Sequence, residues 1–153
     1  MIEAGKRAPD FTLPSSQGGK IKLRDLRGQP VVLYFYPKDD TPGCTTEACA
    51  FQDSSAKIER TGAVVLGVSP DDVASHEKFA AKYKLRFPLL ADTDKKVATK
   101  YGTWGEKVLY GKKTIGMIRS TFIIDETGTV RKVFKRVRVD GHAGKVLEAL
   151  ESL

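Results

Sequence analysis

The sequence predicts an α/β fold, with a mixed central sheet flanked by helices and a small β-hairpin at the N-terminus. Residues 30–36 and 63–69 are continuous apolar runs, which are typical of strands covered on both faces. Residues 120–125 form a third such segment, and Glu126-Thr127-Gly128 after it indicates a hairpin turn. Parallel strands joined by a helix, followed by an antiparallel hairpin, combine into one mixed sheet.

The other elements can be assigned in chain order. The N-terminal hairpin is expected to pair residues 10–13 with residues 20–23, and the strand after the turn runs over residues 129–139. Helices are expected over residues 41–60, 71–84 and 92–101, and from residue 140 onward. Asp71 or Asp72 is a candidate cap for the second of these helices, and Asp92 or Thr93 for the third. This order of elements fits a thioredoxin-like fold.

The length and composition are those of a globular protein. The 153 residues suffice for one domain with a hydrophobic core, so residues 1–153 are interpreted as a single domain. The chain contains no apolar run long enough to span a bilayer, and its start has no apolar signal region. A location in the cytoplasm without a membrane partner is therefore expected. A monomer is expected separately, because a resolving cysteine within the same chain removes one reason to dimerise.

The net charge of +7 has two possible meanings. A basic face can bind nucleic acid or an acidic partner. Alternatively, residues 131–138 are a solvated strand, because valines alternate there with the charged side chains. We favour the solvated strand, since the sequence has no zinc-finger spacing, aromatic platform or basic helix.

The most informative segment contains the two cysteines. Cys44 follows an apolar strand and falls at the expected start of a helix, three residues after Thr41. Backbone N–H groups and the helix dipole at such a position can lower a thiol pKa from about 8.5 to roughly 3.5–7.5. Pro37 stiffens the preceding loop and removes a donor from it. The segment is therefore suited to producing a nucleophilic thiolate.

Cys49 has a different environment from Cys44. Cys44 shares a helical stripe with Ala48 and Phe51, whereas Cys49 lies off this stripe. In an intact helix, Cα atoms five residues apart are separated by about 8.5 Å, and a disulfide needs them within about 7 Å. The two sulfurs can therefore bond only if the first turns of the helix unwind.

The two cysteines have three other interpretations. The first is a pair of inert buried thiols, since cysteine is commonly buried. The second is a metal site, and the third is a dithiol pair of the thioredoxin kind. His76 and His142 share no ligand spacing with the cysteines. Four residues lie between the two cysteines, and thioredoxin-type pairs have two.

Several motifs resemble those of the peroxiredoxin family. Pro37, Thr41 and Cys44 match its Pro-x-x-x-Thr-x-x-Cys pattern, and the position of Cys49 is similar to that in the Q type, or bacterioferritin comigratory protein. The opening Gly5-x-x-Ala8-Pro9-Asp10-Phe11 and the segment 104–125 are also similar, so the resemblance covers nearly the whole chain.

The resemblance implies a role for each candidate residue. Cys44 attacks a hydroperoxide and becomes a sulfenic acid, and Cys49 resolves it to an intrachain disulfide. Thr41 orients the peroxide, while Arg119 stabilises the thiolate and the charge that develops on the peroxide oxygens. Glu47 helps to orient the hydrogen bonds of the site. From the residues alone, a surface arginine at a strand start is the favoured interpretation of Arg119, and the resemblance reverses this. Thr41 can equally be a helix cap, and Glu47 a partner of the helix dipole.

The main hypothesis is a thiol peroxidase that needs no metal, flavin or haem. Its partners are a hydroperoxide substrate and thioredoxin or a similar dithiol reductant. The alternative is a peroxide-sensing thiol switch or binding module that oxidises once without sustained turnover. A nucleic-acid-binding module is a third hypothesis, and it predicts strongly salt-dependent binding.

Overall fold

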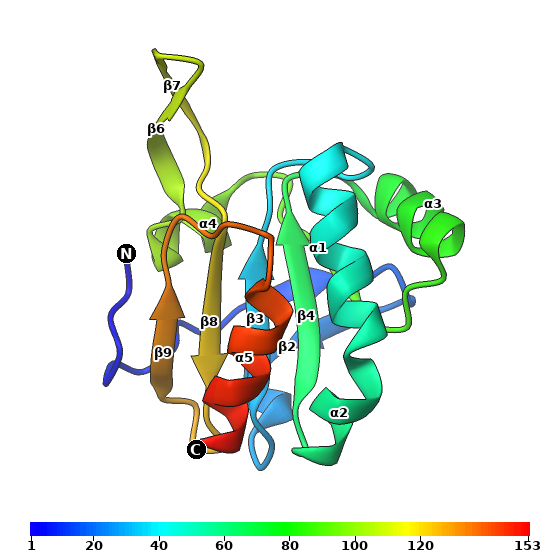
Figure 1. Cartoon of the computed structure of the whole chain (residues 1–153), viewed down its shortest axis with the longest axis vertical. Coiled ribbons are helices and arrows are strands. Elements are labelled where there is room, and N and C mark those ends of the chain that lie inside the picture. The colour runs from blue at the N-terminus through cyan, green and yellow to red at the C-terminus, as the bar shows by residue number, and fades with distance from the viewer.

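The computed structural model describes all residues 1–153 and is built around one mixed sheet (Figure 1). The order of its five strands is β5-β4-β3-β8-β9. Their bounds are β3 Val31–Phe35, β4 Val64–Ser69, β5 Leu89–Ala91, β8 Ser120–Ile124 and β9 Val130–Phe134. β3 pairs parallel with β4 and antiparallel with β8, so the predicted mixed sheet is confirmed.

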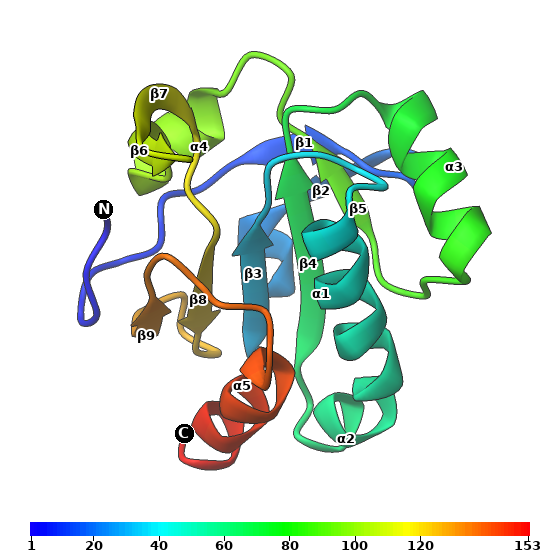
Figure 2. The same cartoon turned by 45° about the horizontal axis from the view of Figure 1, so that its top comes forward.

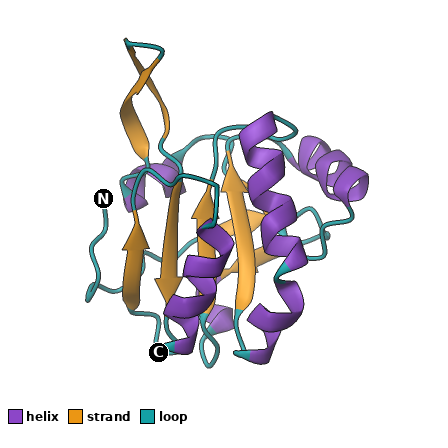
Figure 3. Cartoon of the chain, in the orientation of Figure 1, coloured by secondary structure: helices purple, strands orange, loops and turns teal.

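Helices and a separate hairpin cover both faces of this sheet (Figure 3). The helices are α1 Pro42–Asp53, α2 Ser55–Arg60, α3 Val73–Tyr83, α4 Lys96–Tyr101 and α5 His142–Glu151, with a 3-10 helix η1 over Leu23–Leu26. The predicted N-terminal hairpin is present as β1 Thr12–Pro14 and β2 Lys20–Lys22, paired antiparallel. No helix is both long and apolar enough to cross a bilayer.

The alternation of side chains along β3 creates two hydrophobic cores. Val31, Leu33 and Phe35 pack with the N-terminal hairpin and α4 in one core. Val32 and Tyr34 point to the other face and pack with α1, α3 and α5. Both faces of the strand are buried, as its continuous apolar sequence predicts.

Some boundaries differ from those expected from the sequence. The single helix expected over residues 41–60 is two helices, because the backbone of Ser54 leaves the helical conformation. The last strand ends at Phe134, before the region where Arg136 adopts a positive φ of 50°. Asp72 caps α3 by accepting from the backbone N–H of Ser75, in agreement with the sequence.

A second hairpin was missed by the sequence analysis. It consists of β6 Trp104–Leu109 and β7 Lys112–Met117, which pair only with each other and project from the body of the molecule (Figure 1). Tyr110 and Gly111 form the turn, both with positive φ. Tyr110 is 96% exposed at the tip.

Candidate active site

Cys44 lies in the first turn of α1, at the end of the sheet to which β3 points (Figure 2). Thr41 is the N-cap residue, with extended backbone, and Pro42 opens the helix. The Cys44 side chain is only 2% exposed and packs in the core with Ala48 and Phe51. The sulfur is therefore beside the free N–H groups of a helix start and shielded from bulk water.

Arg119 is carried to this cysteine by the pairing of the central strands. Ser120 at the start of β8 lies opposite Phe35 at the end of β3, which places residue 119 just beyond the sheet. Its Nη2 donates to Cys44 Sγ at 3.3 Å and its Nη1 to Glu47 Oε1 at 2.7 Å. One guanidinium thus bridges the thiol and the carboxylate.

Gly43 makes room for this approach. A Cβ atom on residue 43 would lie 3.2 Å from Arg119 Nη2, closer than ordinary van der Waals contact. The absence of a side chain at residue 43 therefore permits the guanidinium to reach the sulfur.

Glu47 is buried one helical turn after Cys44 and is 1% exposed. Burial raises the pKa of Glu47 from 4.5 to about 7, and Arg119 limits this rise. Glu47 Oε2 has no hydrogen-bond partner, and neither has the buried hydroxyl of Tyr34. Burial, followed by the charge of Glu47, raises the pKa of Tyr34 well above its usual value. The carboxyl thus has one strongly bound oxygen and one without a partner.

Thr41 and Pro37 are half-buried in the loop that leads to Cys44. The Thr41 hydroxyl donates to the carbonyl oxygen of Lys38 at 2.8 Å and makes no cap bond to the helix. The side-chain cap considered for Thr41 is therefore wrong, because its hydroxyl is turned back into the loop. The hydroxyl oxygen retains lone pairs with which it can accept a further hydrogen bond.

Cys49 is half-buried, whereas Cys44 is buried, and both are free thiols. Burial, followed by the charge of Asp53, raises the pKa of Cys49. Both cysteines belong to the continuous helix α1, so their Cα atoms retain the helical separation of about 8.5 Å. Formation of a disulfide between them requires that this part of α1 unwinds.

Two further groups near the site were missed by the sequence analysis. Lys107 of β6 donates to the carbonyl oxygen of Met117 at 2.9 Å. Burial and the charge of Arg119 lower the pKa of Lys107, while Cys44 acts in the opposite direction, so this ammonium lies within electrostatic reach of the sulfur. No sequence signal marks it, because it depends on the unpredicted hairpin.

The other missed group is His76. Its side chain is fully buried against Asp39, and its Nδ1 lies 2.7 Å from Asp39 Oδ2. No pairing of these two residues was expected, since they are far apart in the sequence and share no motif. No cluster of three or more His, Cys, Asp or Glu side chains suitable for a metal ion is present.

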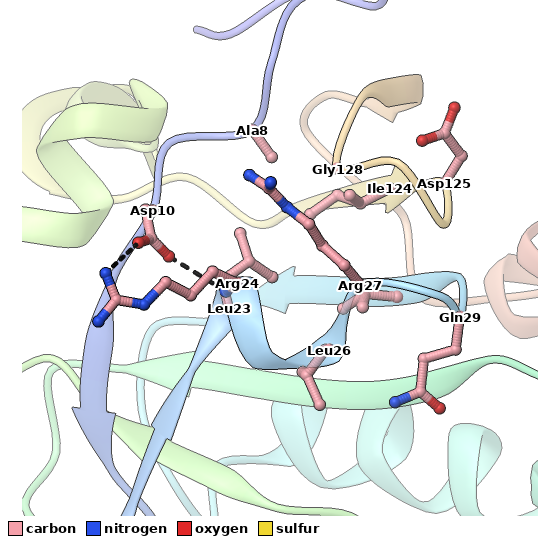
Figure 4. Close-up of a pocket in the computed structure, with 11 residues that line it drawn as sticks. Ala8, Asp10, Leu23, Arg24, Leu26, Arg27, Gln29, Ile124, Asp125 and Gly128 are labelled. Atoms are coloured by element: carbon pink, nitrogen blue, oxygen red, sulfur yellow. Dashed lines mark hydrogen bonds and ion pairs between the residues drawn. The ribbon is translucent and has the colours of Figure 1, made fainter.

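A hollow at the opposite end of β3 does not belong to this site. Figure 4 shows it between η1, the N-terminal segment and the end of β8, with Arg27 lying across it toward Gly128. Asp10 and Arg24 form a surface ion pair beside it, at 3.9 Å. It contains neither cysteine.

Comparison with known proteins identifies the family. Residues 4–133 match the model of the AhpC/TSA family. A putative peroxiredoxin bcp of Coxiella burnetii is 50% identical, covering 97% of this chain and 99% of that protein. The peroxiredoxin Bcp of Bacillus subtilis is 45% identical, covering 99% and 97%. The solved structure of the Xanthomonas campestris bacterioferritin comigratory protein, whose study concerns alkyl peroxide reduction, has a TM-score of 0.91 at 40% identity, covering 98% of each chain.

The fold and the buried cysteine thus define a thioredoxin-like thiol protein of the AhpC/TSA family. Within that family, the chain belongs to the peroxiredoxins of the Q type, or bacterioferritin comigratory protein group. The resemblance stated from its motifs is confirmed.

Proposed function

We propose that the protein is a thiol-dependent peroxidase that reduces hydrogen peroxide and organic hydroperoxides. The observation that carries the proposal is the Cys44 sulfur, buried at a helix start with the Arg119 guanidinium 3.3 Å away. A fixed positive charge and unpaired N–H groups stabilise a thiolate, and the thiolate is the nucleophilic form of cysteine. Membership of the peroxiredoxin family supports the same conclusion.

The chemistry proceeds in two steps on this chain. The Cys44 thiolate attacks one peroxide oxygen, the O–O bond breaks, and the departing oxygen takes a proton and leaves as water or an alcohol. Cys44 is then a sulfenic acid. The Cys49 thiol attacks its sulfur, water leaves, and an intrachain disulfide forms.

The other candidate residues act around these reacting atoms. The backbone N–H of Cys44 and the Thr41 hydroxyl orient the peroxide, and Arg119 stabilises charge on its oxygens. Glu47 holds the guanidinium through the bond of 2.7 Å. Pro37 keeps the loop stiff and removes a backbone donor from it.

A protein dithiol such as thioredoxin returns the disulfide to two thiols in this proposal. Such reductants act in the cytoplasm, where we place the cycle. We further propose that residues 1–153 act as one domain and as a monomer, because both reacting cysteines belong to one helix. The proposed cycle needs no metal, flavin or haem.

The test is peroxide consumption in the presence of a thioredoxin system. Wild type should turn over many times, and Cys44→Ser should be inactive. Cys49→Ser should react once with peroxide and leave a sulfenic acid that a dimedone-type reagent traps at Cys44. A wild-type protein that oxidises once and stops would instead be a peroxide-sensing switch. Full turnover by Cys44→Ser would contradict the assignment of the nucleophile.

A further inference from the structure

Two carboxylates connect the loop before Cys44 to α3, and they differ in burial. Asp40 is exposed, with its carboxylate 2.8 Å from Lys82 Nζ and 2.7 Å from the Tyr83 hydroxyl. Asp39 is buried and contacts a different part of α3. The two adjacent attachments therefore allow a buried contact and an exposed contact to be compared within one loop.

The carboxylate of Asp39 accepts three side-chain hydrogen bonds. The Tyr36 hydroxyl donates to Oδ1 at 2.5 Å, and the Ser75 hydroxyl donates to Oδ2 at 2.8 Å. His76 Nδ1 lies 2.7 Å from Oδ2. The backbone N–H of Asp39 is also bound, by Asp71 Oδ2 at 2.8 Å. Both the backbone and the side chain of this residue are therefore fixed.

His76 extends the attachment to the central sheet. The side chain is fully buried, and its Nε2 lies 3.0 Å from the carbonyl oxygen of Leu90 in β5. Both ring nitrogens face acceptors, a carbonyl on one side and a carboxylate on the other. The ring therefore joins Asp39 to β5 through one contact at each of its nitrogens. Loss of the ring leaves the buried Asp39 side chain without one of its three side-chain partners.

This buried cluster lies directly next to the reactive segment. Asp39 stands between Pro37 and Thr41, both candidate site residues, and Asp40 turns the chain with a positive φ of 58° before α1 begins. The chain from Asp39 to Cys44 is therefore short, and it contains Asp40, with its left-handed backbone, and Pro42. Displacement of Asp39 moves the start of α1 relative to Arg119, which is attached through β8.

We propose that Asp39 and His76 are positioning residues that fix the start of the reactive segment. In the reduced protein they hold Thr41 and Cys44 against Arg119. When α1 unwinds to form the disulfide, the buried pair stays in place and is the fixed boundary of the unwound segment. This inference rests on the proposed peroxidase function.

The test separates the two chemical steps by rapid-quench mass spectrometry. His76→Leu should lower the second-order rate constant for Cys44 oxidation by peroxide about tenfold to hundredfold, because reactive geometry is lost with small displacements. The rate of disulfide formation from the sulfenic acid should not fall. His76→Asn should recover part of the loss, since its amide can still donate to Asp39.

Lys82→Ala is the matched control, because it removes the exposed partner of Asp40 in the same loop. It should leave both rates unchanged. If His76→Leu does not fold, Tyr36→Phe removes a single donor to Asp39 and should give a smaller loss in the same step.

Three results would overturn the inference. These are an unchanged oxidation rate in His76→Leu, an equal fall in both rates, and a failure of His76→Asn to recover any activity. A wild-type Cys44 that does not react with peroxide would instead overturn the proposed function. The two failures are therefore distinguishable.

Discussion

Arg119 is the charged residue that contacts the sulfur of Cys44 directly. It donates to the sulfur and to Glu47 at the same time, so the carboxylate fixes the guanidinium beside the sulfur. Burial lowers the pKa of Arg119, but the charges of Glu47 and Cys44 outweigh this and raise it overall. The guanidinium therefore stays positive throughout the cycle.

Replacement of this charge should slow the peroxide step. Arg119→Met retains much of the side-chain length and loses the charge, and we expect the rate of Cys44 oxidation to fall by about 10²–10³. Stopped-flow oxidation by hydrogen peroxide measures this rate, and thiolate ultraviolet absorbance shows whether less of the thiol is ionised. Arg131→Met, which removes an exposed partner of Asp125, is the control and should react at the wild-type rate. A wild-type rate in Arg119→Met would remove Arg119 from the site.

Glu47 should make stability depend on pH in a defined direction. Its folded pKa of about 7 exceeds the ordinary 4.5, so the folded state binds a proton more tightly than the unfolded state. The contribution of Glu47 to the free energy of unfolding is present below pH 4.5. It is lost as the pH rises to about 7, and the free energy of unfolding falls by about 3 kcal/mol over this range. In urea titrations across this range, Glu47→Gln should lose less stability than wild type. If the free energy of unfolding depends on pH with the same slope in both proteins, the raised pKa of Glu47 is contradicted.

The sequence indicated the candidate reactive residues, but it did not predict the contacts that hold them. Cys44 and Thr41 could be identified locally, because a helix start after an apolar strand can be read from neighbouring residues. Arg119 and Glu47 came from the family resemblance alone, since their contact depends on the pairing of β3 with β8. The contact between Asp39 and His76 joins residues 37 apart in the chain, and no local pattern encodes it.

Among the elements, α1 combines two requirements. It must be intact for Cys44 to lie at a helix start, and it must unwind for Cys49 to reach Cys44. The break at Ser54 separates it from α2, where Ile58 packs in the core. Unwinding of α1 therefore need not extend to the packing of α2.

Hydrogen exchange should detect this local change. In the disulfide form, amide protons of residues 44–49 should lose protection, while that of Ile58, which donates to Ser54 at 3.0 Å, should keep it. Cys49→Ser treated with peroxide forms no intrachain disulfide, so the amide protons of residues 44–49 and of Ile58 should all keep their protection. Unchanged protection of residues 44–49 in the disulfide form would contradict the need for unwinding.

The elements that the sequence missed have two physical causes. β5 has only three residues, too few to show periodicity, and becomes a strand by pairing with β4. β6 and β7 carry exposed apolar side chains near the tip of their hairpin, so their pattern does not separate an inner from an outer face. The continuous runs of β3 and β4 were identified because both faces are buried.

At the scale of the molecule, two buried groups give stability opposite dependences on pH. Burial, followed by the charges of Lys145 and Arg119, lowers the pKa of His142 from 6.5 to about 4. The unfolded state then binds a proton that the folded state does not, so stability is lost as the pH falls from 6.5 toward 4. Glu47 acts in the opposite sense over much of the same range.

The free energy of unfolding of the wild type should therefore change less with pH than it would if only Glu47 or only His142 had a shifted pKa. His142→Gln can keep a hydrogen bond to Thr121, which lies 2.8 Å from the His142 ring. Its free energy of unfolding should fall less than that of wild type between pH 6.5 and pH 4. Urea denaturation at a series of pH values measures this, and an equally steep acid loss in both proteins would contradict the prediction.

The close approach of Arg119 to Gly43 limits which substitutions the protein tolerates at residue 43. The atom nearest to a new side chain would be the far end of Arg119, a long side chain that must shift by a few tenths of an ångström. Saturation mutagenesis of this codon should thus yield proteins that are well folded and soluble. Selection for survival in peroxide should nevertheless favour glycine over larger residues, although this residue neither ionises nor reacts.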